Sequence, residues 1–278
     1  MSGPKIGLAL GGGSARGLAH IPMLEVFDEL GLRPTIIAGC SIGALVGAGY
    51  ASGMTAAEIR ARAEMLLSNR FDAMRYVFGA KRTRLWDILA LRGIGSLQIK
   101  GKKLVGLVLP EGLPENIEDT AIPFKVVTTD FEAREERVID RGNLVTAVAA
   151  SIAIPGVIEG PFIGGRLHID GGVTNPVPFD HVRDGTDFVV AIDVTGRPRP
   201  PAHAHHSNME IAIGSLLIMF HQVAELRRAT NPPNIYIEPS IESFKGGDFF
   251  KLQEVFDAAM PAKEQLKREL DLQINRAA

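Results

Sequence analysis

Residues 35–43 have the sequence Thr-Ile-Ile-Ala-Gly-Cys-Ser-Ile-Gly, and mostly apolar residues follow at 44–50. A β-branched and apolar run that enters Gly-x-Ser-x-Gly and continues as a helix is the setting of a nucleophile elbow, in which a strained turn exposes a serine. Gly39 and Gly43 suit this turn because they have no Cβ to collide with the start of the helix. The segment therefore predicts Ser41 as a nucleophile. A glycine-rich turn with an incidental serine is the alternative.

A second glycine-rich turn, Gly-Gly-Gly-Ser-Ala-Arg-Gly at residues 11–17, follows an apolar strand pattern at 6–10 and precedes a helical stripe at 18–30. Right-handed crossovers place the carboxyl ends of neighbouring parallel strands at one edge of a sheet. We therefore expect this turn beside Ser41. Backbone N–H groups fixed at such a turn could form an oxyanion hole, as could the N–H after the nucleophile. The predicted donors are Gly11, Gly12, Gly13 and Ile42. A simple strand-to-helix turn is the alternative.

Both nucleotide-binding fingerprints fail at this turn. A dinucleotide fingerprint that starts at Gly11 requires glycine at position 16, which is Arg16. A phosphate-binding P-loop requires lysine after its last glycine, but Gly17 is followed by Leu18. A nucleotide-binding module is therefore the weaker hypothesis for this chain.

The composition sets broad limits. The chain has 278 residues, of which 46% are hydrophobic, and a formal net charge of −2. That size supports one large domain over residues 1–278, and the charge gives no indication of a nucleic-acid partner. The single cysteine, Cys40, excludes internal disulfides. No signal peptide pattern and no apolar run of about 18 residues is found, so we expect a cytoplasmic protein.

The order of the remaining patterns predicts an α/β fold, with three layers (α/β/α) around a central, mostly parallel sheet. Residues 70–120 are expected to form a helical excursion or lid, and 198–206 a surface loop. Further strands are expected at 124–129, 137–140, 161–163, 166–170, 187–193 and 234–238. Further helices are expected at 55–67, 84–91, 102–109, 143–151, 208–229 and 248–275, the last broken at Pro261.

A serine nucleophile needs a base. Asp170 is the favoured base because it ends a strand pattern and precedes Gly171-Gly172, although a plain Asp-Gly turn is the alternative. His168 is a rival, but it lies on the same strand face as Asp170 and is poorly placed to stand between Asp170 and Ser41. Cys40 is a second rival that we expect to point into the core. The other candidate bases are Asp130, Asp140, His181, His203, His205 and His206.

Four motifs in this order resemble the conserved blocks of the patatin-like phospholipases. They are the turn at 11–17, the elbow at 39–43, Ala150-Ser151-x-x-x-Pro155 and Asp170-Gly171-Gly172, all within residues 6–195. The resemblance is greatest to compact bacterial single-domain members. Residues 196–278 carry none of it and are expected to complete the domain with helices and a strand.

The resemblance implies a Ser41/Asp170 dyad without histidine, and an oxyanion hole at Gly11–Gly13. Arg16 would stabilise that loop or bind a lipid phosphate, and Ser151 and Pro155 would support the site. The implied activity is hydrolysis of acyl esters of phospholipids or lysophospholipids, with no metal and no cofactor. A carboxylesterase or thioesterase acting on soluble acyl groups is the alternative.

Two further patterns raise questions of partners. The helix at 208–229 is apolar on nearly every face at first, which usually indicates a core helix. The alternatives are a helix at a lipid surface, which would attach the protein peripherally to the inner membrane face, and a homodimer interface. The histidines at 203, 205 and 206 could suggest zinc, but no carboxylates accompany them.

Overall fold

The computed structural model describes residues 3–68, 99–197 and 208–277. One eight-stranded mixed sheet forms the centre, in the order β10-β9-β1-β2-β4-β8-β7, with β5 also paired to β4. The strands from β10 to β4 are parallel, and β5, β7 and β8 join antiparallel. Their bounds are β1 Ile6–Leu10, β2 Ile36–Cys40, β4 Phe124–Asp130, β5 Glu135–Ile139, β7 Phe162–Ile163, β8 Arg166–Asp170, β9 Phe188–Ile192 and β10 Ile235–Ile237.

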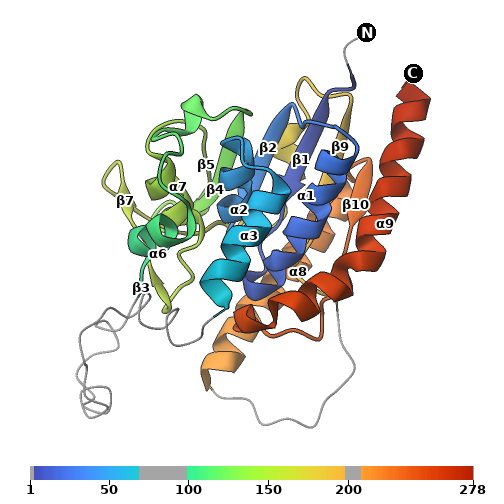
Figure 1. Cartoon of the computed structure of the whole chain (residues 1–278). Coiled ribbons are helices and arrows are strands. Elements are labelled where there is room, and N and C mark those ends of the chain that lie inside the picture. Colours follow the sequence, from blue (N-terminus) through green and yellow to red (C-terminus); the bar gives the residue numbers. More distant parts are fainter. Residues whose placement is uncertain (1–2, 69–98, 198–207, 278) are drawn as a thin grey trace, which may run out of the picture.

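Helices lie on both faces of this sheet, with α1, α2, α3 and α9 in front of it in Figure 1 and α8 behind it. Two short strands, β3 Ile99–Lys100 and β6 Ile158–Glu159, pair separately. The α-helices are α1 His20–Glu29, α2 Ile42–Ala51, α3 Ala56–Leu67, α6 Gly101–Val108, α7 Leu144–Ser151, α8 Asn208–Thr230 and α9 Leu252–Ala277. The 3₁₀ turns are η1 Ser14–Ala19, η3 Ile117–Asp119, η4 Gly171–Val173, η5 Phe179–Val182 and η6 Phe249–Lys251.

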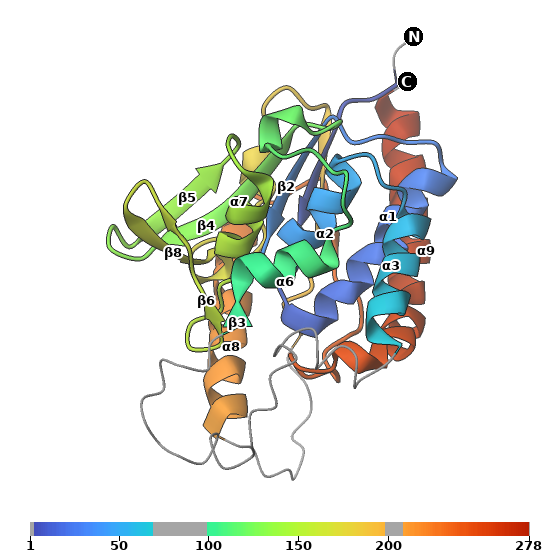
Figure 2. The same ribbon diagram turned by 60° about the vertical axis from the view of Figure 1, so that its left-hand side comes forward.

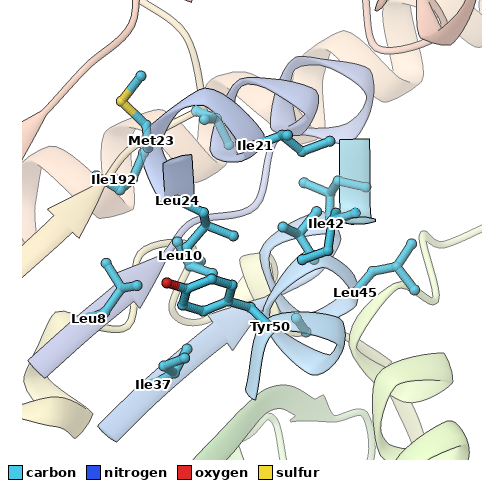
Figure 3. Packing of buried hydrophobic residues seen from close by; sticks show 14 of the residues in the cluster. Leu8, Leu10, Ile21, Met23, Leu24, Ile37, Ile42, Leu45, Tyr50 and Ile192 are labelled. Carbon is cyan, nitrogen blue, oxygen red and sulfur yellow. The ribbon is translucent and has the colours of Figure 1, made fainter. Parts of the chain in front are cut away.

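The two faces of the sheet are packed differently. Side chains alternate along each strand, so large residues point to one face and small ones to the other. The large residues form the main core with α1, α2 and α9; Figure 3 shows part of it, including Leu8, Leu10, Ile21, Leu24, Ile37 and Tyr50. On the other face the strands present Ala9, Ala38 and Ala191, which lets η5 pack closely. A Cβ on Gly7 would collide with the Val182 carbonyl.

The predicted fold class is confirmed, and most predicted elements lie within two residues of their expected bounds. The predicted break at Pro261 is wrong, because α9 continues through it. Proline removes one helical hydrogen bond and bends a helix without necessarily ending it. α9 does change direction along its length (Figure 1). The helix expected at 84–91, much of the 70–120 excursion and the loop at 198–206 lie outside the described residues.

The core role expected of residues 208–229 is wrong for most of α8. Only Phe220 and Ala224 are buried among the described side chains of this helix. The first half of α8 extends beyond the sheet, as both Figure 1 and Figure 2 show. Several of its apolar residues, including Ile211, Ile218 and Met219, are therefore exposed, although the sequence interpretation expected them in the core.

Candidate active site

Two strands that run toward each other bring Ser41 and Asp170 together. β2 lies parallel to β4, and its last residue, Cys40, pairs with Val127. β8 lies antiparallel along the same edge of β4, and Asp170 pairs with Thr128, the next residue. β5 occupies the opposite edge of β4. The ends of β2 and β8 therefore meet, and each contributes one side chain at the junction.

The turn after β2 is strained as a nucleophile elbow should be. Ser41 has φ 51° and ψ −123°, a conformation that residues with a side chain seldom adopt. The turn also needs close approach of its glycines. A Cβ on Gly39 would lie 2.6 Å from the Ala44 Cα, and one on Gly43 would collide with the Leu10 carbonyl. The two glycines of the motif are therefore required by local packing.

Ser41 and Asp170 interact directly. The Ser41 Oγ donates a hydrogen bond to Asp170 Oδ2 at 2.7 Å. The Gly172 N–H donates to the other carboxylate oxygen at 2.8 Å, which fixes the orientation of the carboxylate. The Ser41 side chain is nearly buried and Asp170 is fully buried. This arrangement allows a proton to pass from serine to carboxylate without an intervening imidazole.

The carboxylate is tuned for proton transfer near neutral pH. Burial raises the pKa of Asp170 to about 7, although hydrogen bonds from Ser41 and from the Gly172 N–H favour the charged form and oppose this rise. A base is most effective when its pKa lies near the working pH. Asp170 therefore has both the position and the basicity of a general base.

For the ester hydrolysis that the sequence resemblance implies, we expect kcat/KM to fall about tenfold per pH unit below about pH 7 and to level off above it, because only an ionised Asp170 could accept the serine proton. The measurement is a pH–rate profile of the purified protein, with circular dichroism at each pH to verify folding. A profile that stays flat from pH 5 to 8 would contradict a base with a raised pKa.

Ser151 supports the elbow from the end of α7. Its Oγ accepts a hydrogen bond from the Ser41 N–H at 2.8 Å and donates one to the Val127 carbonyl at 2.6 Å. It thus ties the strained turn to β4. Pro155 lies four residues farther on and is exposed. The backbone between them contacts β8, since the Asp170 N–H donates to the Ala153 carbonyl.

The glycine loop lies beside Ser41, but two of its predicted donors are already used. The Gly11 N–H donates to the Ile192 carbonyl and the Gly12 N–H to the Pro176 carbonyl. The Gly13 and Ile42 N–H groups have no acceptor among the residues that the structure describes. A Cβ on Gly12 would lie 3.2 Å from the Ser41 Cβ, so the loop packs directly on the nucleophile. An oxyanion hole stays a prediction, and in this conformation its available donors are Gly13 and Ile42.

Arg16 holds the loop from within. Its side chain is buried, and its Nε donates to the Gly13 carbonyl at 3.4 Å. Gly17 packs against Ile42, where an added Cβ would collide with the isoleucine side chain. These contacts connect the glycine loop to the first residue of α2 and favour the loop-stabilising role of Arg16.

The family model described as patatin-like phospholipase matches residues 8–183. The chain belongs to the patatin-like phospholipase family. The matched segment contains all four motifs and both residues of the hydrogen-bonded pair. The strands β2, β4 and β8, the elbow and the Asp-Gly-Gly turn therefore lie within the patatin-like segment.

Relatives of this patatin-like chain are mostly longer proteins. An uncharacterised NTE family protein of Mycobacterium tuberculosis is 34% identical over 212 residues, which cover 75% of this chain and 54% of that protein. Neuropathy target esterase sws of Drosophila melanogaster is 31% identical over 200 residues, 70% of this chain and 13% of that protein. The chain thus spans about half the length of its mycobacterial relative. The structure of ExoU with SpcU from Pseudomonas aeruginosa aligns with a TM-score of 0.47 at 13% identity, over 98% of this chain and 53% of that one.

The rival residues are occupied elsewhere in this patatin-like domain. His168 is buried, and its Nδ1 forms a 2.9 Å hydrogen bond with Thr128 Oγ1. Burial lowers the pKa of His168, so it stays neutral at pH 7. Cys40 is fully buried, and burial raises the pKa of its thiol, which disfavours the nucleophilic thiolate. Asp130 pairs with Arg166. His203, His205 and His206 lie outside the described residues.

His20 is a supporting residue that our sequence interpretation missed. It is fully buried at the start of α1, and its Nε2 lies 2.8 Å from the Gly11 carbonyl. Burial lowers the pKa of His20 to about 4, so the neutral ring donates to that carbonyl. This bond holds the loop against α1. The position of His20 within the apolar stripe at 18–30 is the one sequence signal that could have indicated its burial.

Two groups of titratable side chains lie outside this site. Glu136, Asp180 and His181 come together, as do Asp193, Glu225 and Glu238. Arg227 pairs with Glu136 and Asp180, and Arg228 pairs with Glu225 and Glu238. Each group therefore carries its own balancing cation.

Among the described residues, no helix has the length and apolarity needed to cross a membrane.

Proposed function

We propose that the protein is a lipid acyl hydrolase that cleaves carboxylic acyl esters of phospholipids or lysophospholipids through Ser41 and Asp170. The observation that carries this proposal is the 2.7 Å hydrogen bond from Ser41 Oγ to a fully buried carboxylate. Membership of the patatin-like phospholipase family supports a lipid ester as the substrate. A relative named as an esterase agrees with ester chemistry.

In the proposed reaction, the Ser41 Oγ attacks the ester carbonyl while its proton passes to Asp170 Oδ2. The resulting oxyanion accepts hydrogen bonds from the Gly13 and Ile42 N–H groups, aided by the positive end of α2. Asp170 then returns the proton to the departing alcohol, which leaves an acyl ester on Ser41. Asp170 next takes a proton from water, whose oxygen attacks that ester. Asp170 then returns this proton to the Ser41 Oγ as the bond to the serine breaks and the fatty acid leaves. Every catalytic group in these reaction steps is a side chain or backbone group of the protein, so the proposal includes no metal and no cofactor.

The test is labelling with a fluorophosphonate probe, which reacts only with an activated serine. We expect one adduct per chain, located on Ser41 by mass spectrometry. Hydrolysis of phospholipids, lysophospholipids, triacylglycerols and acyl-CoA is then compared. Activity confined to water-soluble esters or acyl-CoA would favour the carboxylesterase or thioesterase alternative. Absence of both labelling and hydrolysis in the folded protein would refute the proposal.

An uncharged stripe on α8 suggests how the protein reaches its substrate. Ile211, Ile218, Met219 and Leu226 are all more than half exposed and share one face of the helix. On the other side of α8, Phe220 packs on Gly172, two residues after Asp170. Such a stripe suits insertion into the boundary of a lipid layer. We propose that α8 rests on the inner membrane face and that the protein is cytoplasmic and peripherally attached.

We expect Ile218→Asp to lower the bound fraction in vesicle co-sedimentation at least fivefold, because a charge at the centre of the stripe opposes insertion. Leu272→Asp is the matched control, since Leu272 is similarly exposed near the carboxyl end of α9. Equal binding of the two variants to vesicles would contradict the proposal. If Ile218→Asp instead turns a dimer into a monomer in light scattering, the stripe is a homodimer interface.

A further inference from the structure

An apolar cavity of about 130 Å³ lies beside the nucleophile elbow. It is enclosed mainly by α2, α3 and the end of α6, with Leu18 and Phe249 at its margin. Arg62 is the one charged residue among the described residues that line it. The Arg62 guanidinium donates to the Leu107 and Val108 carbonyls at 2.7 and 3.1 Å, so it is engaged at the end of α6. The cavity therefore offers almost no polar partner to a ligand.

The residue that follows Ser41 lines the cavity. Ile42 directly follows Ser41, and Ile42, Leu45 and Gly49 are spaced to lie on one face of α2. At 1.5 Å per residue, this face runs for roughly 10 Å away from the nucleophile. Figure 3 shows Ile42 and Leu45 extending from α2 toward the side where Ile21 lies, and all three line the cavity.

We propose that this cavity receives the acyl chain of the substrate and sets its preferred length, an inference that rests on the proposed hydrolase activity. An apolar cavity of about 150 Å³ holds benzene, so about 130 Å³ suits roughly six carbon atoms. The carbonyl and the next carbon remain at Ser41. An acyl chain of about eight carbons therefore fills the site, and a longer chain has to extend beyond it.

Ala63 provides the sharpest test, because it lines the cavity from the partly exposed helix α3. Ala63→Phe places a ring in the cavity, and Ala61→Phe is the matched control on the exposed face of the same helix. The measurement is kcat/KM for p-nitrophenyl esters of two, four, eight and twelve carbons. In the unmodified protein we expect a rise of about fourfold per methylene up to eight carbons.

Ala63→Phe is expected to lower the ratio of octanoyl to acetyl kcat/KM at least tenfold, whereas Ala61→Phe keeps the ratio of the unmodified protein. An unchanged ratio in folded Ala63→Phe overturns the proposal. If Ala63→Phe does not fold, Gly49→Ala adds a smaller obstruction from α2, where the new Cβ would lie 3.2 Å from the flexible Met54 sulfur. Its ratio is expected to fall about threefold, and an unchanged ratio there counts equally against the proposal.

A binding measurement separates the cavity from the chemistry. Octanoate is titrated calorimetrically into Ser41→Ala protein, with and without Ala63→Phe, and we expect Ala63→Phe to weaken binding at least tenfold. If this loss is seen but no ester is hydrolysed by the unmodified protein, the cavity assignment stands and the hydrolase proposal fails. If esters are hydrolysed without dependence on chain length and octanoate does not bind, the cavity assignment fails and the hydrolase proposal stands.

Discussion

Ser41→Ala is expected to lower kcat for ester hydrolysis by about 10⁴-fold or more, because the variant lacks the atom that forms the acyl-enzyme. The fold should tolerate this change. Ser41 Oγ takes part in one hydrogen bond, to Asp170, and a typical hydrogen bond contributes about 1 kcal/mol to the free energy of unfolding. Alanine also retains the Cβ, so the packing against Gly12 is preserved.

The measurement is steady-state hydrolysis of p-nitrophenyl butyrate together with thermal unfolding followed by circular dichroism. Ser52→Ala is the matched control at the other end of α2, since the Ser52 hydroxyl is buried and has no hydrogen-bond partner within the described part of the chain. This control should retain the activity of the unmodified protein. Normal turnover by a folded Ser41→Ala protein would rule out the proposed nucleophile.

The parts of this site that depend on local sequence could be predicted. The elbow requires a strand, small residues on both sides of the serine and a helix in direct succession. Gly39 and Gly43 satisfy steric demands set by neighbouring atoms. Asp170 could be selected because a strand end followed by two glycines is also a local pattern. The start of the helix predicted at 55–67 is local in the same way, because Thr55 and Glu58 form a capping box there.

The parts that depend on strand register could not be predicted. β2 and β8 meet because Cys40 pairs with Val127 and Asp170 with Thr128, and no local pattern determines that alignment. Long-range packing also decides which glycine N–H groups are available. The Ile192 and Pro176 carbonyls, more than 160 residues away, accept those of Gly11 and Gly12.

The exposure of α8 also depends on long-range packing. It could not be predicted, because the apolar composition of this helix is typical of a buried helix. A sequence pattern shows which residues could be buried, but it does not show whether another element lies opposite them. The sheet face next to α8 is already covered in part by η5. Only the second half of α8, around Phe220 and Ala224, therefore finds a place in the core.

Asp170→Asn is expected to lower kcat/KM about 10³-fold or more and, at the same time, to stabilise the fold at alkaline pH. Activity falls because the amide cannot accept the serine proton. Stability rises because burial favours the neutral carboxyl: the pKa of Asp170 is about 7 in the folded protein, against 3.8 as its ordinary value. The folded protein therefore holds a proton that the unfolded chain releases, and its stability falls as the pH rises from about 4 to 7.

Asparagine removes this dependence, because its neutral amide stays uncharged at every pH. Its oxygen can still accept from the Gly172 N–H, and its amino group can donate to the Ser41 Oγ. In urea unfolding, the difference in free energy of unfolding between Asp170→Asn and the unmodified protein should grow by about 2–3 kcal/mol from pH 5 to pH 8.

Asp130→Asn is the matched control with the opposite sign. The Ala133 N–H, together with Arg166, lowers the pKa of Asp130, so its charged form stabilises the fold and asparagine should destabilise it at pH 8. Asp130→Asn should also retain ester hydrolysis. Asp170→Asn could be inactive and yet gain no stability relative to the unmodified protein between pH 5 and pH 8. The carboxylate would then be required for activity, but its pKa would not be raised toward 7. The tuning of this base by burial would then be refuted, while the dyad would stand.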